Sequence, residues 1–344
     1  MLIRVGIVGC GRMGEIHLRI VREVKGVEVV GVADTDVSRA NAFAAKEKIG
    51  VAAGDLGSLM ERSRPDAVHI VTPPATHASL ACMALRAGCH VFVEKPMALT
   101  AQDAGLVVAA AKQGPILTVG HNHLFDPAIR EACARVAQGR LGQLIGLDAF
   151  HGALPGLPGW LAELPYGPWM EDAPHPLYLS QLFMGDPLAV RAIGHPSSEG
   201  SKFKEVRVVT QHAGGVSSLT FSEATVPYRH RLTLFGTKRT LEIDLVAGSL
   251  VENRPITGHR WLAKGLANLD AASQLLLATG RNAARVLMRR EQSWPGLRAL
   301  IEAFYAAIRA GGPSPVPATQ GVHVAKLLDE IGRLLTAAPN GLQG

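Results

Sequence analysis

The pattern of hydrophobic and polar positions divides the chain into two parts. In the first, short apolar runs at 2–8, 27–33, 67–71, 91–93 and 116–119 alternate with amphipathic segments, among them 77–87 and one that begins at Thr100. Such apolar runs indicate strands buried on both faces, and the amphipathic segments indicate helices. The alternation predicts an α/β Rossmann domain, with a doubly wound parallel sheet, over residues 1–124.

The pattern changes after residue 124. A helix is predicted over 127–137, and alternating polar and apolar positions then predict strands at 144–150, 206–212, 216–221, 230–235 and 240–245. Further helices are predicted over 295–310 and 322–335, and a basic helical insertion near 255–292. Residues 125–344 are therefore expected to form an α+β domain with a mostly antiparallel open sheet.

A glycine-rich turn follows the first predicted strand. Gly9, Gly11 and Gly14 have the GxGxxG spacing, between a strand and a helix, that a dinucleotide pyrophosphate requires. Asp34 ends the second predicted strand, where a carboxylate meets the adenosine ribose hydroxyls. This carboxylate favours NAD(H) over NADP(H), because it would repel a 2′-phosphate. Arg39 argues the other way, since an arginine nearby can accommodate that phosphate.

Four stretches of the sequence resemble one known family. VGCGRMG, VTPPATH, GCHVFVEKPMALT and VGHNHLFDPAI occur in the order and spacing of the Gfo/Idh/MocA oxidoreductases, which include glucose–fructose oxidoreductase and inositol dehydrogenases. The resemblance implies hydride transfer between NAD(H) and a secondary hydroxyl or ketone of a sugar, cyclitol or nucleotide-sugar. It also implies a cis Lys95–Pro96 bond, and a homodimer or homotetramer formed through the open sheet.

The same resemblance implies where the cofactor and substrate bind. The expected cofactor-binding residues are Gly9, Gly11, Arg12, Met13, Gly14, Asp34, Thr35, Arg39, Thr72, Pro73, His77, Glu94, Lys95 and Asn122. The expected substrate-binding residues are Lys95, His123, Trp169, His175 and Tyr178. Trp169 and Tyr178 have a second explanation as ordinary core residues.

Lys95 and His175 are the predicted acid/base residues. Hydride transfer from an alcohol requires removal of the hydroxyl proton, and a partly desolvated lysine or a histidine exchanges protons near neutral pH. The family has an aspartate four residues before the histidine. Glu171 stands there in this chain and Asp172 one residue nearer, so both remain candidate catalytic carboxylates.

The chain also departs from the family pattern. Ala173 replaces the usual glycine two residues before the histidine, and Leu124 replaces an arginine, which leaves the substrate open. Two other functions are compatible with the same residues: a glycosidase that uses NAD for transient oxidation, and a non-catalytic nucleotide-binding sensor. The glycosidase would show no net cofactor turnover.

Composition narrows the class of protein. The chain has 47% hydrophobic and 19% charged residues, and no apolar run of transmembrane length. Four cysteines without CxxC spacing indicate reduced thiols and a cytoplasmic protein, and they do not indicate a metal site. The net charge is +6, and residues 251–300, with eight basic and three acidic residues, account for most of it. Because the rest of the chain is nearly balanced in charge, nucleic acid is not an expected partner.

The basic segment requires its own explanation. Arg281, Arg285 and Arg289 recur every four residues and would form one stripe on a helix, with Arg290 beside it and apolar Leu275–Leu277, Val286 and Leu287 nearby. Three interpretations remain open: a solvated face, a site for the diphosphate of a nucleotide-sugar, or peripheral contact of residues 260–290 with an anionic membrane.

Overall fold

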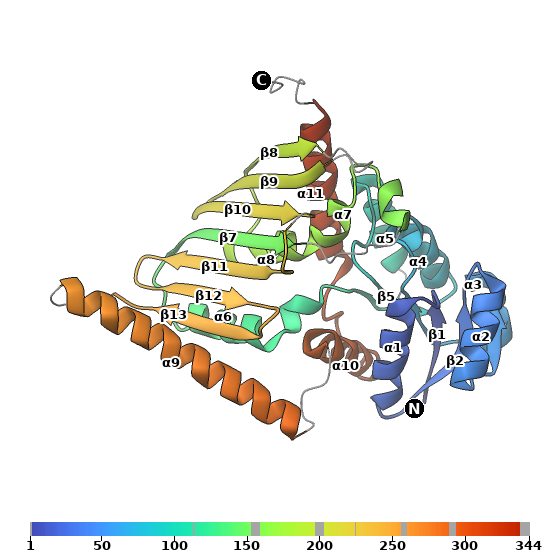
Figure 1. The fold of residues 1–344 in the computed structure, drawn as a ribbon. Helices are drawn as coiled ribbons and strands as arrows, with labels where there is room; N and C mark the ends of the chain where they lie inside the picture. The colour runs from blue at the N-terminus through green and yellow to red at the C-terminus, as the bar shows by residue number, and fades with distance from the viewer. Residues whose placement is uncertain are drawn as a thin grey trace. The chain divides into compact units, whose positions relative to one another are not determined.

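The computed structural model describes residues 2–112, 114–152, 159–196, 203–223, 225–255, 260–288 and 294–337. The chain divides into two compact units, each containing one sheet (Figure 1). The first unit is Met1–His121 with Leu297–Asp329, and the second is Asn122–Gly296 with Glu330–Gly344.

The first unit is built on a six-stranded parallel sheet in the order β3-β2-β1-β4-β5-β6. Its strands are β1 (Ile3–Val8), β2 (Val27–Ala33), β3 (Val51–Ala53), β4 (Ala67–Ile70), β5 (His90–Val93) and β6 (Leu117–Val119). Its helices before residue 121 are α1 (Arg12–Glu23), α2 (Val37–Glu47), α3 (Leu56–Ser63), η1 (Pro74–Thr76), α4 (His77–Arg86) and α5 (Ala101–Ala111). The predicted α/β fold class is confirmed.

The order of the strands indicates at which edge of this sheet a ligand would bind. Ile3, Val5 and Ile7 are fully buried, as expected of a central parallel strand. The order reverses between β1 and β4, and such a reversal opens a crevice beyond the carboxyl ends of the strands. The residues that follow β1, β2, β4 and β5 therefore share one edge.

The expected domain boundary assigned residues 125–344, and with them the C-terminal helices, to the second domain. The first unit includes most of α10 (Pro295–Ala310) and the first part of α11 (Ala318–Ala337). The physical reason is aromatic packing: Phe304 and Tyr305 of α10 are fully buried, and their rings contact His69 of β4.

The second unit contains a seven-stranded sheet in the order β13-β12-β11-β7-β10-β9-β8. The β7–β10 pair is parallel and the other pairs are antiparallel, as predicted for a mostly antiparallel sheet. The strands are β7 (Leu144–Gly152), β8 (Ala189–Pro196), β9 (Phe203–His212), β10 (Gly215–Ser222), β11 (His230–Gly236), β12 (Thr240–Asp244) and β13 (Ser249–Asn253). Strands β8 and β13 were not predicted from the hydrophobic pattern.

The helices of the second unit before residue 295 are η2 (Asn122–Phe125), α6 (Pro127–Ala137), η3 (Gly159–Glu163), α7 (Trp169–Asp172), α8 (Pro174–Met184) and α9 (Arg260–Leu287). Of these, η2, α7 and α8 carry residues of the site described below. Helix α8 packs on β7 and β10, while α9 runs alongside edge strand β13 (Figure 1).

Candidate active site

The glycine turn after β1 has the backbone that a pyrophosphate site requires. Gly9 has a φ of 107°, and a Cβ there would lie 2.8 Å from the Val71 carbonyl oxygen. A Cβ at Gly14 would lie 2.1 Å from the Gly9 carbonyl oxygen, so α1 approaches the turn too closely for a side chain. A Cβ at Gly11 would meet no described atom within 4 Å. The first turn of α1 therefore faces open space, where its backbone N–H groups can donate hydrogen bonds to a phosphate.

Asp34 is fixed beside this turn. One carboxylate oxygen accepts a 2.9 Å hydrogen bond from the Cys10 backbone N–H, and the other a 2.9 Å bond from that of Asp36. Nη1 of Arg39 lies 3.4 Å from both Asp34 oxygens, and Arg39 also pairs with Asp36. The predicted residues Arg12, Thr35 and Pro73 are exposed in the same unit, whereas Met13 packs on its core.

His77 connects the loops that follow β4 and β5. Its Nδ1 lies 2.8 Å from the Pro96 carbonyl oxygen, and its Nε2 lies 2.7 Å from that of Thr72. Burial lowers the pKa of His77 and outweighs these two carbonyl contacts. His77 is thus a positioning residue that ties the Thr72 loop to the Lys95–Pro96 segment, whose peptide bond is cis.

Lys95 is half-buried directly after β5, next to the buried carboxylate of Glu94. Glu94 accepts a 3.2 Å hydrogen bond from the Lys95 backbone N–H, and its other oxygen lies 3.1 Å from Nε2 of His17. Burial alone would raise the pKa of Glu94, but the hydrogen bond and charge of His17, together with Lys95, lower it overall. Glu94 therefore stays ionised beside Lys95.

Behind Glu94 lies a chain of buried polar groups that sequence analysis missed. Nδ1 of His17 lies 2.8 Å from Nδ1 of His69, and Nε2 of His69 lies 2.7 Å from the Tyr305 hydroxyl. Burial holds the pKa of His69 well below its usual value. Tyr305 is remote in sequence from the other members, so no local pattern pointed to this chain.

The second unit gathers four histidine rings. They are His123 of η2, His151 of β7, His175 of α8 and His230 of β11. Ring centroids are 4.5 Å apart for His123 and His175, 4.7 Å for His123 and His230, and 4.3 Å for His151 and His230. The described residues nevertheless contain no group of three or more side chains arranged to hold a metal ion.

Hydrogen bonds fix the orientation of this cluster. The Tyr178 hydroxyl lies 2.8 Å from Nδ1 of His175 and accepts a 3.2 Å bond from the His123 backbone N–H. Nδ1 of His123 also contacts the Asp126 carboxylate. Tyr178, buried and bonded to His175, is placed to orient that ring.

Asp172 reaches the cluster from α7. Its Oδ1 lies 3.3 Å from Nε2 of His151. Burial, followed by the charge of Asp172, raises the pKa of Tyr228 to about 12, and the Tyr228 ring lies 5.8 Å from that of His151. Trp169 is buried in the same helix as Asp172, and its Nε1–H donates to the Tyr166 carbonyl oxygen at 2.8 Å. Its packing is therefore that of a core residue.

His151, Tyr228 and His230 were not among the predicted site residues. A weak signal existed for His151, because it continues the inward positions Leu147 and Ala149 of β7. His230 has the same relation to Leu232 and Leu234 of β11. A histidine at an inward position near a strand end could have been singled out on that basis.

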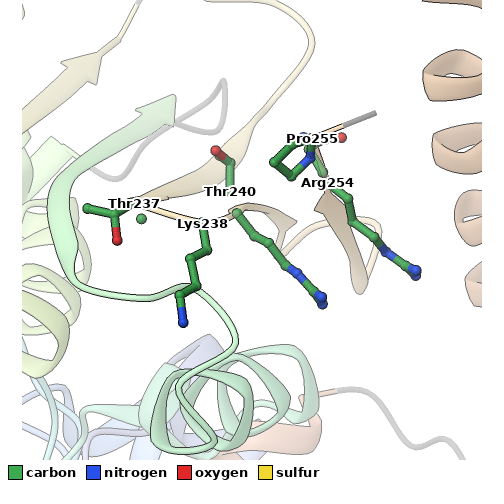
Figure 2. A pocket seen from close by; sticks show the side chains of 8 residues that line it. Thr237, Lys238, Thr240, Arg254 and Pro255 are labelled. Carbon is green, nitrogen blue, oxygen red and sulfur yellow. The ribbon is translucent and has the colours of Figure 1, made fainter. Parts of the chain in front are cut away.

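A shallow pocket of about 340 Å³ lies elsewhere in the second unit (Figure 2). Its lining comes from the β11–β12 turn and from the end of β13: Gly236, Thr237, Lys238, Arg239, Thr240, Asn253, Arg254 and Pro255. None of the clustered histidines lines it. The pocket is cationic, because Lys238, Arg239 and Arg254 line it, and its lining includes no histidine, carboxylate or aromatic side chain.

The chain is similar to known proteins, and these similarities define its class and then its family. Residues 3–121 match the oxidoreductase family with an NAD-binding Rossmann fold, which makes this chain an NAD-binding oxidoreductase. Residues 129–242 match the GFO/IDH/MocA C-terminal domain. The chain belongs to the Gfo/Idh/MocA family, as the sequence motifs predicted.

Individual relatives cover most of the chain. The 1,5-anhydro-D-fructose reductase of Ensifer adhaerens is 28% identical over 282 residues, which cover 80% of this chain and 83% of that protein. The dTDP-3,4-didehydro-2,6-dideoxy-alpha-D-glucose 3-reductase of Saccharopolyspora spinosa is 30% identical over 250 residues, covering 70% and 74%. The WlbA dehydrogenase of Bordetella pertussis, solved with NADH and UDP-GlcNAcA, has the same fold, with a TM-score of 0.80 at 20% identity over 98% of this chain and 97% of that chain.

Proposed function

We propose that this oxidoreductase transfers a hydride between NAD(H) and a secondary hydroxyl or ketone of a sugar, cyclitol or nucleotide-sugar. The relatives described above reduce an anhydro-sugar and a dTDP-linked sugar, or were solved with a UDP-linked sugar. They are named as reductases and dehydrogenases, which favours net hydride transfer over the glycosidase alternative.

The observation that carries the proposal is the orientation of His175. Its Nδ1 contact with Tyr178 holds the ring within a group of buried histidines, in a site that supplies both an acid/base and hydrogen bonds to hydroxyl groups. Bound NAD⁺ or NADH supplies the hydride acceptor or donor. Lys95 and His175 exchange the hydroxyl proton, and His151, Tyr228 and His123 orient the substrate.

We assign cofactor binding to residues of the first unit. The N–H groups at the start of α1 hold the pyrophosphate, and the fixed Asp34 carboxylate accepts hydrogen bonds from the ribose hydroxyls. Arg39 is engaged by two carboxylates, which supports NAD over NADP.

A substrate panel tests the reaction. Purified protein is assayed with sugars, cyclitols and nucleotide-sugars, while NADH absorbance and product formation are followed together. Substrate-dependent change in NADH is expected with at least one compound. Product formed without net cofactor turnover would support the glycosidase instead, and cofactor binding without any turnover across the panel would support a sensor.

We also propose a cytoplasmic homodimer or homotetramer, associated through the open face of the second sheet. The four cysteines are free thiols. Ile193, Val209 and Val216 are exposed apolar side chains on that sheet, and their burial would favour association. Light scattering coupled to gel filtration measures the assembly, and a monomer at micromolar concentration would contradict it.

A further inference from the structure

Helix α9 carries the basic segment noted in the sequence. The side-chain amides of Gln274 and Asn282 hydrogen-bond to backbone groups of residues 247–252, so they mark the side of α9 that meets the sheet edge. Arg281 and Arg285 follow these amides by seven and three residues, spacings that place them on the same side. The rest of the predicted stripe lies outside the described residues: Arg289, Arg290 and the side chain of Val286. No described helix is long and apolar enough to cross a membrane, and we assign α9 neither a phosphate site nor a membrane contact.

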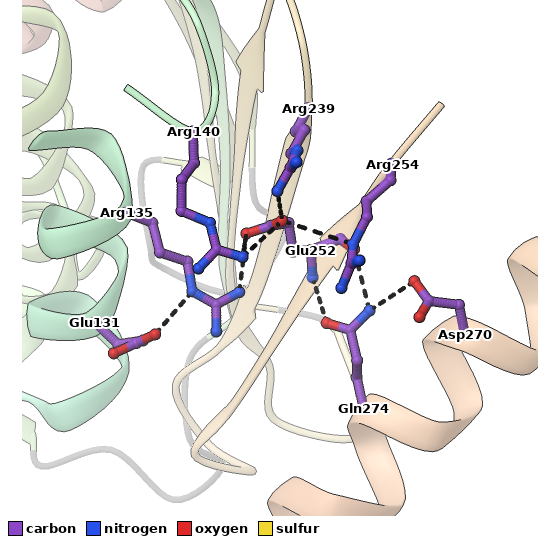
Figure 3. Close-up of polar contacts among 8 residues, drawn as sticks. All are labelled: Glu131, Arg135, Arg140, Arg239, Glu252, Arg254, Asp270 and Gln274. Atoms are coloured by element: carbon purple, nitrogen blue, oxygen red, sulfur yellow. Dashed lines mark hydrogen bonds and ion pairs between the residues drawn. The ribbon is translucent and has the colours of Figure 1, made fainter. Parts of the chain in front are cut away.

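The sheet edge beside α9 shows one way in which this protein holds a buried carboxylate. Among the described residues, the buried acidic side chains are those of Glu94 and Glu252. Glu252 of β13 contacts four arginines: Arg135, Arg140, Arg239 and Arg254 (Figure 3). Burial raises the pKa of Glu252, but the hydrogen bonds and charges of arginines in this group lower it overall. The arginines cancel the charge of Glu252, so little of that charge acts on other groups.

Glu94 is held differently, because no arginine contacts it among the described residues. Its Oε1 lies 3.1 Å from Nε2 of His17, and its Oε2 accepts a 3.2 Å hydrogen bond from the Lys95 backbone N–H. An ionised carboxylate can only accept hydrogen bonds, so the His17 nitrogen is the donor. A neutral His17 donates this bond without cancelling the negative charge, which remains available to Lys95.

His17, His69 and Tyr305 form a buried hydrogen-bond relay that ends at Glu94. All three side chains are fully buried, and the His69 ring stacks on Phe92 with 4.9 Å between ring centroids. A neutral imidazole has one N–H, so the 2.8 Å contact between the two Nδ1 atoms fixes the direction of donation. With His17 neutral, the Tyr305 O–H donates to His69, the His69 N–H donates to His17, and the His17 N–H donates to Glu94. Every ring nitrogen of the relay is then satisfied while Glu94 is ionised.

The other titratable groups around Glu94 and the relay carry little charge near neutral pH. Burial lowers the pKa of His77, and it lowers that of His121 to about 3, although the charge of Glu94 opposes both effects. Both rings therefore stay neutral. Burial raises the pKa of Tyr305 well above its usual value against the charge of Arg309, so the Tyr305 hydroxyl keeps its proton. Lys95 is thus the cation on which the charge of Glu94 acts.

We propose that His17, His69 and Tyr305 are positioning residues for proton transfer at Lys95. The relay holds Glu94 as a carboxylate. Glu94 in turn binds the Lys95 backbone N–H and favours the protonated form of the Lys95 side chain, because opposite charges stabilise each other. Without the relay, Glu94 takes up a proton at higher pH and Lys95 loses this partner. The inference rests on the acid/base role proposed above for Lys95.

Carboxyl ¹³C NMR of the full chain, labelled at glutamate, tests the relay directly. The Glu94 signal is assigned by its loss in Glu94→Gln and is followed against pH. His17→Leu should move the Glu94 titration to higher pH by about one pH unit, a tenfold change in protonation, because the donor is lost. His17→Gln should move it less, since an amide N–H can still donate to the carboxylate. The Glu252 signal is the internal control, and its titration should stay in place. An unmoved Glu94 titration in His17→Leu would overturn the proposal.

A second pair of variants keeps the test decisive if His17→Leu does not fold. Tyr305→Phe removes only the hydroxyl at the far end of the relay, and it should move the Glu94 titration to higher pH by about half a pH unit, roughly threefold in protonation. Phe304→Leu is the matched packing control. Phe304 is also fully buried and its ring contacts His69 and Phe92, but it makes no hydrogen bond in the relay. Phe304→Leu should lower the Tm and leave the Glu94 titration in place. Equal movement in both variants would mean that Glu94 responds to packing, and the relay would be wrong.

Kinetics then connect the relay to Lys95. With a ketone from the substrate panel, the acid limb of kcat/KM should move to higher pH together with the Glu94 titration in His17→Leu and Tyr305→Phe, and not in Phe304→Leu. A displaced Glu94 titration with an unmoved acid limb would overturn the positioning role, because the relay would then serve stability alone. Absence of turnover across the panel, with the Glu94 titration displaced as expected, would contradict the proposed reaction and still support the control of Glu94 by the relay.

Discussion

His151 and His230 are direct cross-strand neighbours in the antiparallel β7–β11 pair, with ring centroids 4.3 Å apart. Both side chains point to the buried face of the sheet. Burial, together with the nearby His151 and His123, holds the pKa of His230 well below its usual value. Two imidazoles this close repel each other if both are protonated. Asp172 is the carboxylate that contacts His151, and its negative charge reduces that repulsion.

The pair Asp172 and Glu171 offers a direct test of which carboxylate serves the site. Asp172→Asn is expected to lower kcat/KM about tenfold or more, because it removes the charge beside His151. Glu171→Gln is the matched change one residue away and should cost less. Steady-state kinetics on the substrate found in the panel measure both. A larger loss for Glu171→Gln would assign the role to Glu171 instead.

Lys95 and His175 are predicted to carry the proton transfer. Lys95→Ala and His175→Ala should each lower turnover by a factor of about 10² to 10⁴, the usual scale of general acid–base catalysis. NAD⁺ binding should survive His175→Ala, since that residue belongs to the second unit and the glycine turn to the first. Near wild-type turnover in both variants would refute the proposed mechanism.

Local patterns predicted much of the fold. The strand runs and glycine turn of the first unit depend on burial and backbone conformation, which a short window of sequence reveals. The packing of α10 on His69 could not be anticipated, because it depends on contacts between residues more than 230 positions apart. β13 was missed for a related reason: its polar residues Glu252 and Asn253 are satisfied by arginines, Gln274 and Glu242, which only the folded chain brings together.

The residues of the site that belong to a sequence motif could be predicted, whereas the histidines that strand pairing brings together could not. Asp34 and Lys95 follow strands, so their placement at one edge follows from parallel topology. The histidine cluster depends on strand pairing, which brings His230 opposite His151, and on α8, which adds His175. No spacing in the sequence encodes that register. The predicted helix at 255–292 formed as α9, but only the structure shows that Leu269, Leu276 and Leu287 are exposed.

Stability should fall as the solution is acidified from pH 6.5 towards 4.5. Burial lowers the pKa of His121 to about 3, and it also lowers those of His69 and His230. A histidine that stays neutral when folded gains a proton on unfolding below its unfolded pKa of about 6.5, so its stabilising contribution is present above that pH and is lost below it. Each such group contributes up to about 1.4 kcal/mol per pH unit in this window.

The histidine contribution can be isolated by thermal unfolding across that window. Above pH 4.5 it is separated from that of Glu94 and Glu252, whose lowered pKa values make them lose their contribution at lower pH. His121→Gln should make the Tm less dependent on pH, whereas His195→Gln, at an exposed position, should not. A wild-type Tm that stays constant between pH 6.5 and 4.5 would contradict buried, neutral histidines.

Cofactor preference should depend on Asp34. Its two oxygens are held by the backbone N–H groups of Cys10 and Asp36, so the carboxylate cannot turn away from a bound ribose without losing both bonds. Wild type is therefore expected to bind NAD⁺ more tightly than NADP⁺ in calorimetry.

Asp34→Ala should weaken NAD⁺ binding about tenfold or more, because hydrogen bonds to a charged group contribute about 1.5–3 kcal/mol. The same change should strengthen NADP⁺ binding, since it removes the repulsion of the 2′-phosphate and releases Arg39 from one of its carboxylate partners. Arg39→Ala in the Asp34→Ala background should reverse that gain, whereas Arg39→Ala alone should leave NAD⁺ binding nearly unchanged. NADP⁺ binding by wild type that equals or exceeds NAD⁺ binding would show that Arg39, not Asp34, decides the preference.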